Sequence, residues 1–541
     1  MRSSRQFVVL GLFILAGFVA YSNILNSYFI SDDFSQIGKV LAGDLSVVWG
    51  KEHGGFFRPL FILSYLVDTK LWGLNPVGFH LSNIAFHSLN SFLVFALSLR
   101  MLESLKLHSV TRQGISLAAG ALFLLHPSHT EAVSWISGRV DVLATFFCLA
   151  ALLSYLGYAR SKRVSQLGSS LLFFSLALLA KESAICLPFL VIILGLSRFE
   201  ARKDSKSLWR FVSVIAVYFS ILLVFIAVRS RFLGSLIGGY GVKQHLNFAP
   251  GWLRDRLLEA SVRSVLPMLP FQLSRFLFKP LQSRVFILFS LACAGLIVTL
   301  IVFRRRWYSR AERREGNRFL IVLASLFLVS LLPVINLRLS LYETWGERFL
   351  YFPSVFACLL IAYLAAMLIR RKELWLLILI CIVGFYSVSL YRTNRTWRQA
   401  AELSRSIQNE LVHSSTRDHL MILNLPDNLR GTPIFHNGLP EALEYFQNER
   451  HFKRIETLAF QDLRSVTDGV EITRNTDSLI IHLRSDQNGF SRIESTECFE
   501  VADQSRNSLA RNSLELRVKT CSHDTDIFFF DEGRMIKLPN Q

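Results

Sequence analysis

The chain has 541 residues, of which 52% are hydrophobic and 18% are charged, and its mean hydropathy is +0.38. Soluble domains carry about a quarter charged residues, so this composition excludes a soluble enzyme, a disordered scaffold and a collagenous chain. It indicates a polytopic α-helical membrane protein. The formal net charge of +19 would suggest nucleic acid as the partner of a soluble chain. In this chain we attribute the charge to membrane topology and expect no nucleic-acid partner.

Apolar runs of helix length recur along the first 390 residues and predict about eleven transmembrane helices. The runs lie at 7–24, 80–99, 114–126, 141–158, 168–181, 184–197, 211–228, 285–303, 318–336, 349–369 and 373–390. The third, fifth and sixth runs are short. They can span only if their polar ends lie in a cavity instead of in lipid.

Basic residues give the orientation of these helices. Arg2 and Arg5 precede the first run, which places the N-terminus in the cytoplasm by the positive-inside rule. The first run lacks a cleavage pattern, so we interpret it as a retained helix. Alternation then places every short basic cluster on the cytoplasmic side, and these clusters lie at 100–112, 160–163, 198–210, 304–318 and 370–372.

The same alternation leaves three segments outside the cytoplasm: a first loop at about 26–78, a second long loop at about 230–283, and the tail. Within the first loop, 34–49 and 60–72 are amphipathic and should lie at the membrane surface. We therefore divide the chain into a transmembrane domain, 1–398, and a small extracytoplasmic α+β domain, 399–541. In the tail, alternating stretches predict strands at 478–484, 513–518 and 526–530, and a helix is expected at 440–449.

Cysteine usage agrees with this division. Cys498 and Cys521 are the only cysteines outside the apolar runs, and in an oxidising compartment they could pair. We favour this disulfide over two free thiols. No Cys/His spacing typical of a metal site occurs, so a divalent metal is not supported as a cofactor.

Placing an ionisable side chain at membrane depth costs free energy, so such residues are usually functional or paired. Here they gather on the extracytoplasmic side, between runs too short to carry them far from the bilayer, so we expect a rim or an outward-opening cavity. Carboxylates mixed with cations and imidazoles suit a reaction on an anionic, membrane-embedded substrate. These residues are Asp32, Asp33, Arg58, His126, His129, Glu131, Arg139, Asp141, Lys181, Glu182, Glu343, Glu347 and Arg348.

Five motifs in chain order carry a resemblance to a known family. They are Asp32-Asp33, His126-Pro-x-His-Thr-Glu-Ala-Val with Gly138-Arg139, Lys181-Glu182, Glu347-Arg348-x-x-Tyr351-x-Pro353-Ser354, and Arg392-Thr393-x-x-x-Trp397. Over about 1–400 the chain resembles the transmembrane and tetratricopeptide-repeat O-mannosyltransferases, members of the C-type (GT-C) glycosyltransferase superfamily. The resemblance implies a multi-span fold, a lumenal or periplasmic active site, a polyprenyl-phosphate sugar donor and inversion at the anomeric carbon.

The chain departs from this family after residue 400, where the tetratricopeptide repeats are absent. The sugar, which could be mannose, and the acceptor therefore stay open. The acceptor would be a hydroxyl of a protein Ser or Thr, a lipid or a glycan. We favour a bacterial inner membrane, with the endoplasmic reticulum as the alternative.

The site residues each have a functional and a structural interpretation. One of Asp32 and Asp33 should be the catalytic base and the other should orient a ligand, with Asp33 preferred; alternatively, the pair caps an interfacial helix. His126, His129 and Glu131 could contact phosphate or sugar, bind a metal or support the loop. Arg139 could bind donor or pair with Asp141. Donor binding is also expected of Arg58, Lys181, Glu182, Glu347 and Arg348, for which the alternative is an interfacial anchor.

The predicted function is thus an inverting glycosyltransferase of the membrane. A transporter or lipid flippase is the runner-up, although no duplicated half is visible and the polar residues lie at helix ends. A third hypothesis is a structural protein whose tail binds partners and whose transmembrane helices only anchor it, but eleven transmembrane helices exceed what an anchor needs. Trp135, Trp252, Trp345 and Trp397 are expected in the aromatic belts of the membrane interfaces.

Overall fold

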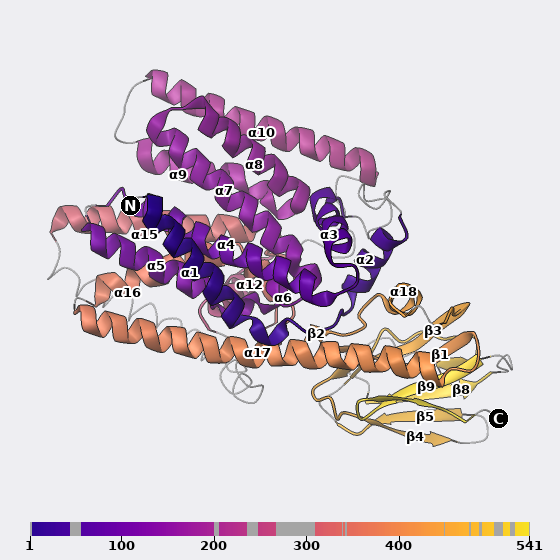
Figure 1. Cartoon of the computed structure of the whole chain (residues 1–541). Helices are drawn as coiled ribbons and strands as arrows, with labels where there is room; N and C mark the ends of the chain where they lie inside the picture. Colours follow the sequence, from indigo (N-terminus) through magenta and orange to yellow (C-terminus); the bar gives the residue numbers. More distant parts are fainter. Residues whose placement is uncertain are drawn as a thin grey trace.

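The computed structural model describes residues 3–43, 56–105, 107–199, 205–234, 247–266, 309–337, 339–340, 343–369, 371–447, 450–474, 478–485, 489–501, 512–519 and 525–539. A bundle of helices forms one part of the molecule and a β-rich domain forms the other, and a single long helix, α17, runs along both (Figure 1). The long helices are α1 (Ser3–Ala20), α4 (Pro76–Leu102), α5 (Ser109–Leu124), α7 (Arg139–Ser161), α8 (Val164–Ala180), α9 (Leu187–Phe199), α10 (Ser205–Leu233), α15 (Arg310–Leu331), α16 (Ser354–Leu368) and α17 (Lys372–Ser414).

These helices confirm the predicted membrane class. Among the described residues, α4, α7, α10, α15 and α17 contain stretches long and apolar enough to cross a membrane, and α1, α8, α9 and α16 are shorter apolar helices. Every predicted apolar run except 285–303 overlaps a described helix; that run lies outside the described residues. The total of eleven spans and the side on which each end lies stay predictions.

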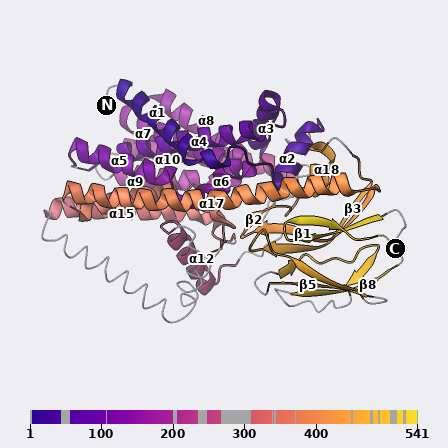
Figure 2. The same ribbon diagram turned by 60° about the horizontal axis from the view of Figure 1, so that its bottom comes forward.

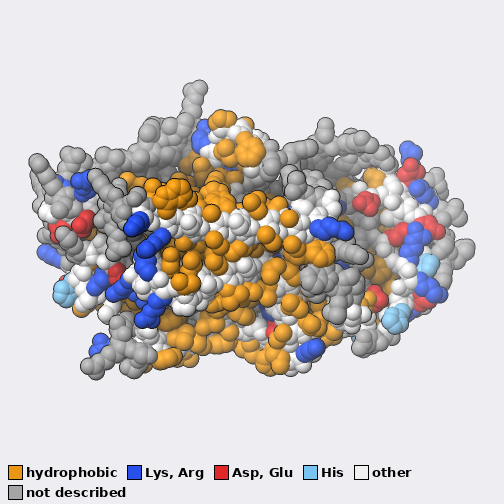
Figure 3. All heavy atoms as spheres, turned by 90° about the horizontal axis from the view of Figure 1, so that it is seen from above, with side chains coloured by type: hydrophobic (Ala, Val, Ile, Leu, Met, Phe, Trp, Pro, Cys, Tyr) orange, Lys and Arg blue, Asp and Glu red, His pale blue; other side chains and the backbone are white. Residues whose placement is uncertain are grey.

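The outer surface of the bundle is apolar, as contact with lipid requires. Figure 3 shows hydrophobic side chains over its face, with Lys and Arg side chains gathered at the end away from the β-rich domain. Trp209 and Leu223 of α10 are 72% and 66% exposed, and Leu377 of α17 is 56% exposed. Such large exposed apolar side chains, on helices at opposite sides of the bundle, indicate a lipid-facing surface.

Short elements gather at the other end of the bundle, beside the β-rich domain (Figure 1). Two helices follow α1 in the first loop. The first, α2, is amphipathic as predicted, but α3 has apolar side chains on its exposed face as well, including Leu63, Val67 and Leu71, so its predicted amphipathic character is wrong. Residues 44–49 of the first predicted stretch lie outside the described residues. The short elements are η1 (Ser22–Ile24), α2 (Asp32–Leu41), α3 (Pro59–Trp72), η3 (Pro127–His129), α6 (Thr130–Val133), η4 (Ile136–Gly138), η5 (Glu182–Cys186), α12 (Pro250–Arg263), η8 (Leu332–Val334) and η9 (Glu347–Leu350).

The C-terminal domain contains two sheets and one short helix. The first sheet has the order β10-β9-β1-β3-β6, with β2 paired to β1; β1 runs parallel to β3 and β9, whereas the other pairs are antiparallel. The second sheet is antiparallel, with the order β4-β5-β8-β7. Their elements are β1 (His419–Leu429), β2 (Thr432–Pro433), α18 (Leu439–Tyr445), β3 (Arg454–Leu463), β4 (Val470–Arg474), β5 (Ser478–Leu483), β6 (Gly489–Ser491), β7 (Phe499–Val501), β8 (Ser513–Val518), β9 (Thr525–Asp531) and β10 (Arg534–Lys537).

Strand β1 is the centre of this domain because both of its faces are buried. Met421 and Leu423 pack against the second sheet, whereas Leu420 and Ile422 pack against α17 and α18. The predicted strands at 478–484, 513–518 and 526–530 and the predicted helix are confirmed. The domain has three layers, and Figure 2 shows α17 beside the first sheet.

Helix α17 joins the two parts of the molecule. It is continuous through residue 398, where the sequence suggests a domain boundary, and the first strand begins only at His419. Its last turns contribute Ile407 and Leu411 to the same core as Phe34 of α2 and Phe528 of β9. The C-terminal domain therefore packs directly on the first-loop helices.

The cysteines of the tail are only partly described. Cys498 is buried and disulfide-bonded. Cys521, its predicted partner, lies outside the described residues. The pairing of these two cysteines therefore stays a prediction.

Candidate active site

The segment from His126 to Asp141 connects α5 with α7 and is buried throughout, although it contains many polar side chains. Its short helices contact α2, η9 and α17, so elements from distant parts of the sequence converge on it. The predicted site residues belong to this segment or to the elements around it. Of these elements, α2, α3 and α6 are labelled in Figure 1, at the end of the bundle beside the C-terminal domain.

Asp33 is anchored in this segment. The Ser137 N–H and hydroxyl donate to Asp33 Oδ1 at 2.8 and 2.5 Å, and the Ile30 N–H donates to Oδ2 at 3.1 Å. The side chain is only 1% exposed. Burial raises the pKa of Asp33 to about 7, although these hydrogen bonds oppose the rise. Asp33 thus fixes α2 against the segment, and its oxygens already have donors.

Asp32 lies next to it but in a different environment. It is half-buried, and its Oδ1 accepts a hydrogen bond of 2.8 Å from the Asn437 side chain of the C-terminal domain. The Asn437 N–H also lies 3.4 Å from the Ser31 hydroxyl oxygen. Of the two carboxylates, Asp32 is the one that an acceptor could reach.

A backbone contact holds the C-terminal domain at this point. The Ser31 N–H donates to the Ile434 carbonyl at 2.8 Å. Gly438 has a φ of +88°, and a Cβ atom there would lie 2.5 Å from the Ser31 carbonyl oxygen. Glycine permits both this left-handed conformation and the close approach.

Two ion pairs connect α3, α7 and η5. Arg58 Nε donates to Glu182 Oε2 at 2.9 Å, and its second nitrogen lies 2.5 Å from Oε1, which makes the pair bidentate. Lys181 Nζ lies 2.5 Å from Asp141 Oδ1 in a buried pair. Lys181 and Glu182 therefore have separate partners.

Arg348 of η9 lies against the other side of the segment. Its backbone N–H donates to Glu131 Oε2 at 2.8 Å, its guanidinium lies 3.6 Å from Glu131 Oε1, and the guanidinium covers the Trp135 ring at 4.7 Å. The neighbouring Glu347 forms a buried ion pair with Arg263 of α12. Burial lowers the pKa of Arg263 to about 9.

Arg139 pairs with a different carboxylate from the one expected, and its predicted role in donor binding stays a prediction. It does not pair with Asp141; its guanidinium lies 2.6 Å from Asp68 Oδ2, donates to Asn83 Oδ1 at 2.6 Å and donates to the Phe79 carbonyl at 2.9 Å. The side chain is 1% exposed, so it ties α3, α4 and α7 together. In this arrangement the Arg139 side chain stabilises the packing of these three helices next to the site.

His126 and His129 are enclosed by protein. His126 Nε2 lies 3.0 Å from the Ser264 carbonyl oxygen, and His129 Nε2 lies 2.7 Å from the Ser354 hydroxyl. Both rings are at most 1% exposed. These contacts match the loop-supporting interpretation, and ligand contact by either ring stays a prediction. Among the described residues, no group of three or more His, Cys, Asp and Glu is placed to hold a metal ion.

The predicted aromatic belts are wrong for two tryptophans. Trp135 and Trp397 are 4% and 1% exposed, and their rings stack on each other at 6.3 Å. They pack with Ile30 and Ala401 inside the protein, away from lipid. Local sequence cannot separate a tryptophan at a membrane interface from one buried beside a site.

Several residues around the site were missed by the sequence analysis. Asp68, Asn83, Arg263 and Asn437 were not singled out because each has its partner on a distant element. A polar residue inside an apolar run, such as Asn83, is the one signal that could have been used.

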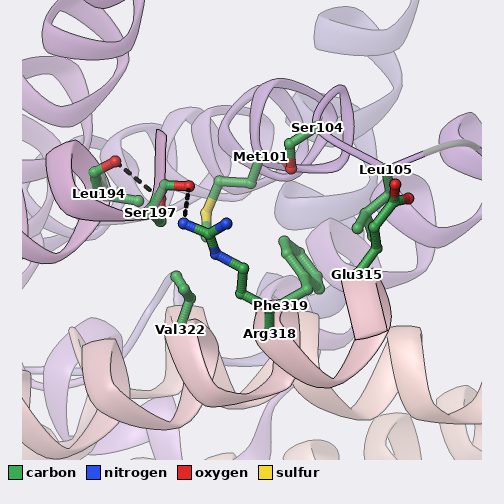
Figure 4. Close-up of a pocket in the computed structure, with 9 residues that line it drawn as sticks. All are labelled: Met101, Ser104, Leu105, Leu194, Ser197, Glu315, Arg318, Phe319 and Val322. Carbon is green, nitrogen blue, oxygen red and sulfur yellow. Dashed lines mark hydrogen bonds between the residues drawn. The ribbon is translucent and has the colours of Figure 1, made fainter. Parts of the chain in front are cut away.

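A small cavity of about 240 Å³ between α4, α9 and α15 contains none of the predicted site residues (Figure 4). In it, Arg318 donates to the Ser197 carbonyl at 2.9 Å and so satisfies a carbonyl near the end of α9. This cavity therefore has a structural explanation.

Comparison with curated proteins confirms the resemblance expected from the motifs. The chain is 37% identical over 188 residues to the protein O-mannosyl-transferase Tmtc1 of Drosophila melanogaster, which covers 31% of this chain and 20% of that protein. It is 32% identical over 241 residues to Tmtc2 of the same species, covering 40% and 24%, and 26% identical over 394 residues to human TMTC3, covering 65% and 40%. The aligned part thus spans less than half of each relative.

No protein-family model matches the chain. Among solved structures, ArnT from Cupriavidus metallidurans bound to undecaprenyl phosphate is similar over 82% of this chain and 85% of that chain, with 14% identity and a TM-score of 0.42. This likeness is too distant to define the fold. The chain resembles membrane glycosyltransferases in sequence, and more specifically the protein O-mannosyl-transferases.

Proposed function

We propose that the chain is an inverting membrane glycosyltransferase that moves a sugar, with mannose as the first candidate, from a polyprenyl-phosphate donor to a hydroxyl acceptor. The reaction takes place on the extracytoplasmic side. The observation that supports the proposal is the convergence on one short segment of a carboxylate pair and a cation. Ser137 donates a hydrogen bond to Asp33 in the first turn of α2. Glu131 accepts a hydrogen bond from the Arg348 N–H, and the Trp135 ring lies under the Arg348 guanidinium.

Asp32 would act as the base. The acceptor oxygen attacks the anomeric carbon as the bond from that carbon to the phosphate oxygen breaks, and the acceptor proton passes to the carboxylate. Sequence reasoning prefers Asp33, but its oxygens accept three hydrogen bonds and its side chain is buried. Asp33 therefore suits the orienting role, and half-buried Asp32 suits proton transfer.

Arg348 is the best-placed cation for the leaving phosphate. A guanidinium can stabilise developing phosphate charge by a bidentate contact. Its guanidinium lies over the ring of Trp135, which belongs to the same buried segment as Ser137, the residue that holds Asp33. Arg348 and the carboxylate pair are therefore held by the same segment.

The test uses purified full-length protein in lipid nanodiscs. Polyprenyl-phosphate mannose and polyprenyl-phosphate glucose are supplied with a Ser/Thr-containing peptide or a glycan, and release of polyprenyl phosphate is measured. We expect Asp32→Asn to lose about 10²-fold or more in turnover, because the amide cannot accept the proton.

The control is Asp255→Asn, which changes an exposed carboxylate of α12 that pairs with Arg254. It should transfer sugar like the unmodified chain. Full transfer by the Asp32/Asp33 double Asn variant would remove the carboxylate mechanism. Absence of turnover with every donor and acceptor would contradict the function itself.

A further inference from the structure

A polar groove lies at the end of the bundle away from the C-terminal domain. It has a volume of about 800 Å³ and is lined by residues of α1, α4, α5, α7 and α8. On α4, its lining residue Arg100 follows Asn83 of the candidate active site by about 25 Å along the helix axis. The groove is therefore separate from that site.

The charged residues in the lining of the groove give it a net positive charge. Arg100, Arg112 and Arg160 line it together with one carboxylate, Glu103. Arg100 and Arg160 share that carboxylate at 3.4 and 3.1 Å. Within the described part of the chain, the half-buried Arg112 guanidinium forms no ion pair. This arrangement is suited to an anion that accepts several hydrogen bonds, such as a phosphate.

One wall of the groove, on α4, is apolar and includes Phe92, Phe95 and Leu99, and Leu153 of α7 adds a further apolar side chain to the lining. Uncharged polar side chains of α1, α5, α7 and α8 complete the lining. From Phe92 to Arg100 the wall extends about 12 Å along α4. A soluble phosphate would leave this wall uncovered, whereas a lipid would place its phosphate at the arginines and its acyl chains on the wall.

We propose that this groove binds an anionic phospholipid, with the headgroup phosphate at Arg112 and the neighbouring arginines. Basic pockets between transmembrane helices are known to take such headgroups. The lipid-facing surface of the bundle ends in a gathering of Lys and Arg side chains at the same end of the molecule (Figure 3). The site is independent of the proposed sugar transfer.

The test is lipid binding to the purified full-length chain in neutral detergent, followed by native mass spectrometry. Phosphatidylglycerol should bind, and phosphatidylcholine should bind at least tenfold more weakly. Arg112→Gln should weaken phosphatidylglycerol binding about tenfold, the equivalent of one charge-assisted hydrogen bond. Arg112→Lys should keep most of the binding, because the charge remains.

Arg163→Gln is the matched control, since Arg163 is an exposed arginine at the same end but outside the groove. It should bind phosphatidylglycerol as the unmodified chain does. Arg160→Gln, at a side chain that is 67% exposed, is a second groove variant that should fold normally and bind more weakly.

Three results would overturn the proposal. Equal binding of the neutral and anionic lipids would remove the charge argument, and equal losses in Arg112→Gln and Arg163→Gln would remove the site. Displacement of phosphatidylglycerol by an equal concentration of inorganic phosphate would show that the groove takes free phosphate and that the apolar wall contributes nothing.

Discussion

At the scale of single residues, Asp33 combines burial with three hydrogen bonds, and burial dominates. Burial raises its pKa to about 7 in the folded protein, whereas an unfolded aspartate has a pKa of about 3.9. Between these two values the folded chain binds a proton that the unfolded chain has released. Asp33 therefore makes the free energy of unfolding fall as pH rises from about 4 to about 7, with little further change above 7.

This difference predicts a pH dependence that one substitution removes. Asparagine cannot titrate, so Asp33→Asn should lack the Asp33 contribution, which is at most about 1.4 kcal/mol per pH unit within the window. The measurement is the thermal unfolding midpoint in detergent at pH 4.5 and 7.5. Asp255→Asn should keep the slope of the unmodified chain. An unchanged slope in Asp33→Asn would show that Asp33 is ionised throughout.

Arg348 gives a second residue-scale prediction. Arg348→Ala should weaken donor binding about tenfold, since it removes a charge-assisted contact to the donor phosphate. Arg348→Lys should recover part of this loss, because the charge stays while the planar fork and the stacking on Trp135 are lost. Donor affinity is measured by titration with polyprenyl-phosphate mannose. Equal affinity in the alanine variant and the unmodified chain would exclude Arg348 from the phosphate site.

At the scale of elements, the turn before α18 connects the C-terminal domain with the start of α2. The Asn437 side chain donates to Asp32 across 405 residues of sequence. Gly438 allows the backbone to approach Ser31. The turn is thus placed to set the direction in which the Asp32 carboxylate faces.

We expect Asn437→Ala to lower turnover about tenfold with little change in donor affinity, since the lost hydrogen bond orients the base and does not hold the donor. The two quantities are measured on the same preparation. Asn409→Ala is the control, because Asn409 also forms an exposed hydrogen bond at 3.0 Å, with Gln447. Unchanged turnover in Asn437→Ala would show that Asp32 needs no support from the C-terminal domain.

Elements with a local pattern could be predicted from the sequence, whereas their partners could not. Apolar runs and alternation are local signals, so the helices and three strands of the tail, β5, β8 and β9, are predicted at nearly the right residues. The central strand β1 is buried on both faces and does not alternate, and it is not predicted. The pairing of Arg139 with Asp68 in place of Asp141, and of Trp135 with Trp397, depends on how distant helices cross. Asp32 and Asp33 look equivalent in the sequence and differ only once Ser137 and Asn437 are in place.

At the scale of the whole molecule, orientation in the membrane is the main prediction. The basic clusters place residues 304–318 in the cytoplasm and the C-terminal domain outside it. A reporter that is active only in the cytoplasm should therefore be silent when fused after Gln541 and active when inserted near residue 204. Activity at the C-terminus would invert the topology and put the candidate active site on the cytoplasmic side.

The continuity of α17 has a consequence for how the two halves of the molecule can evolve. Its 43 residues form a rod of about 65 Å. Trp397 faces the candidate active site and Ile407 faces the C-terminal core, so the rod fixes an angle as well as a distance. One residue inserted between Trp397 and Ile407 would turn everything beyond it by about 100°, whereas seven would restore the angle to within about 20°. Seven residues would also lengthen the rod by about 10 Å and separate the C-terminal domain from its contacts with Ser31 and Asp32. Neither a single residue nor a heptad can therefore be inserted here without breaking the alignment of the two halves.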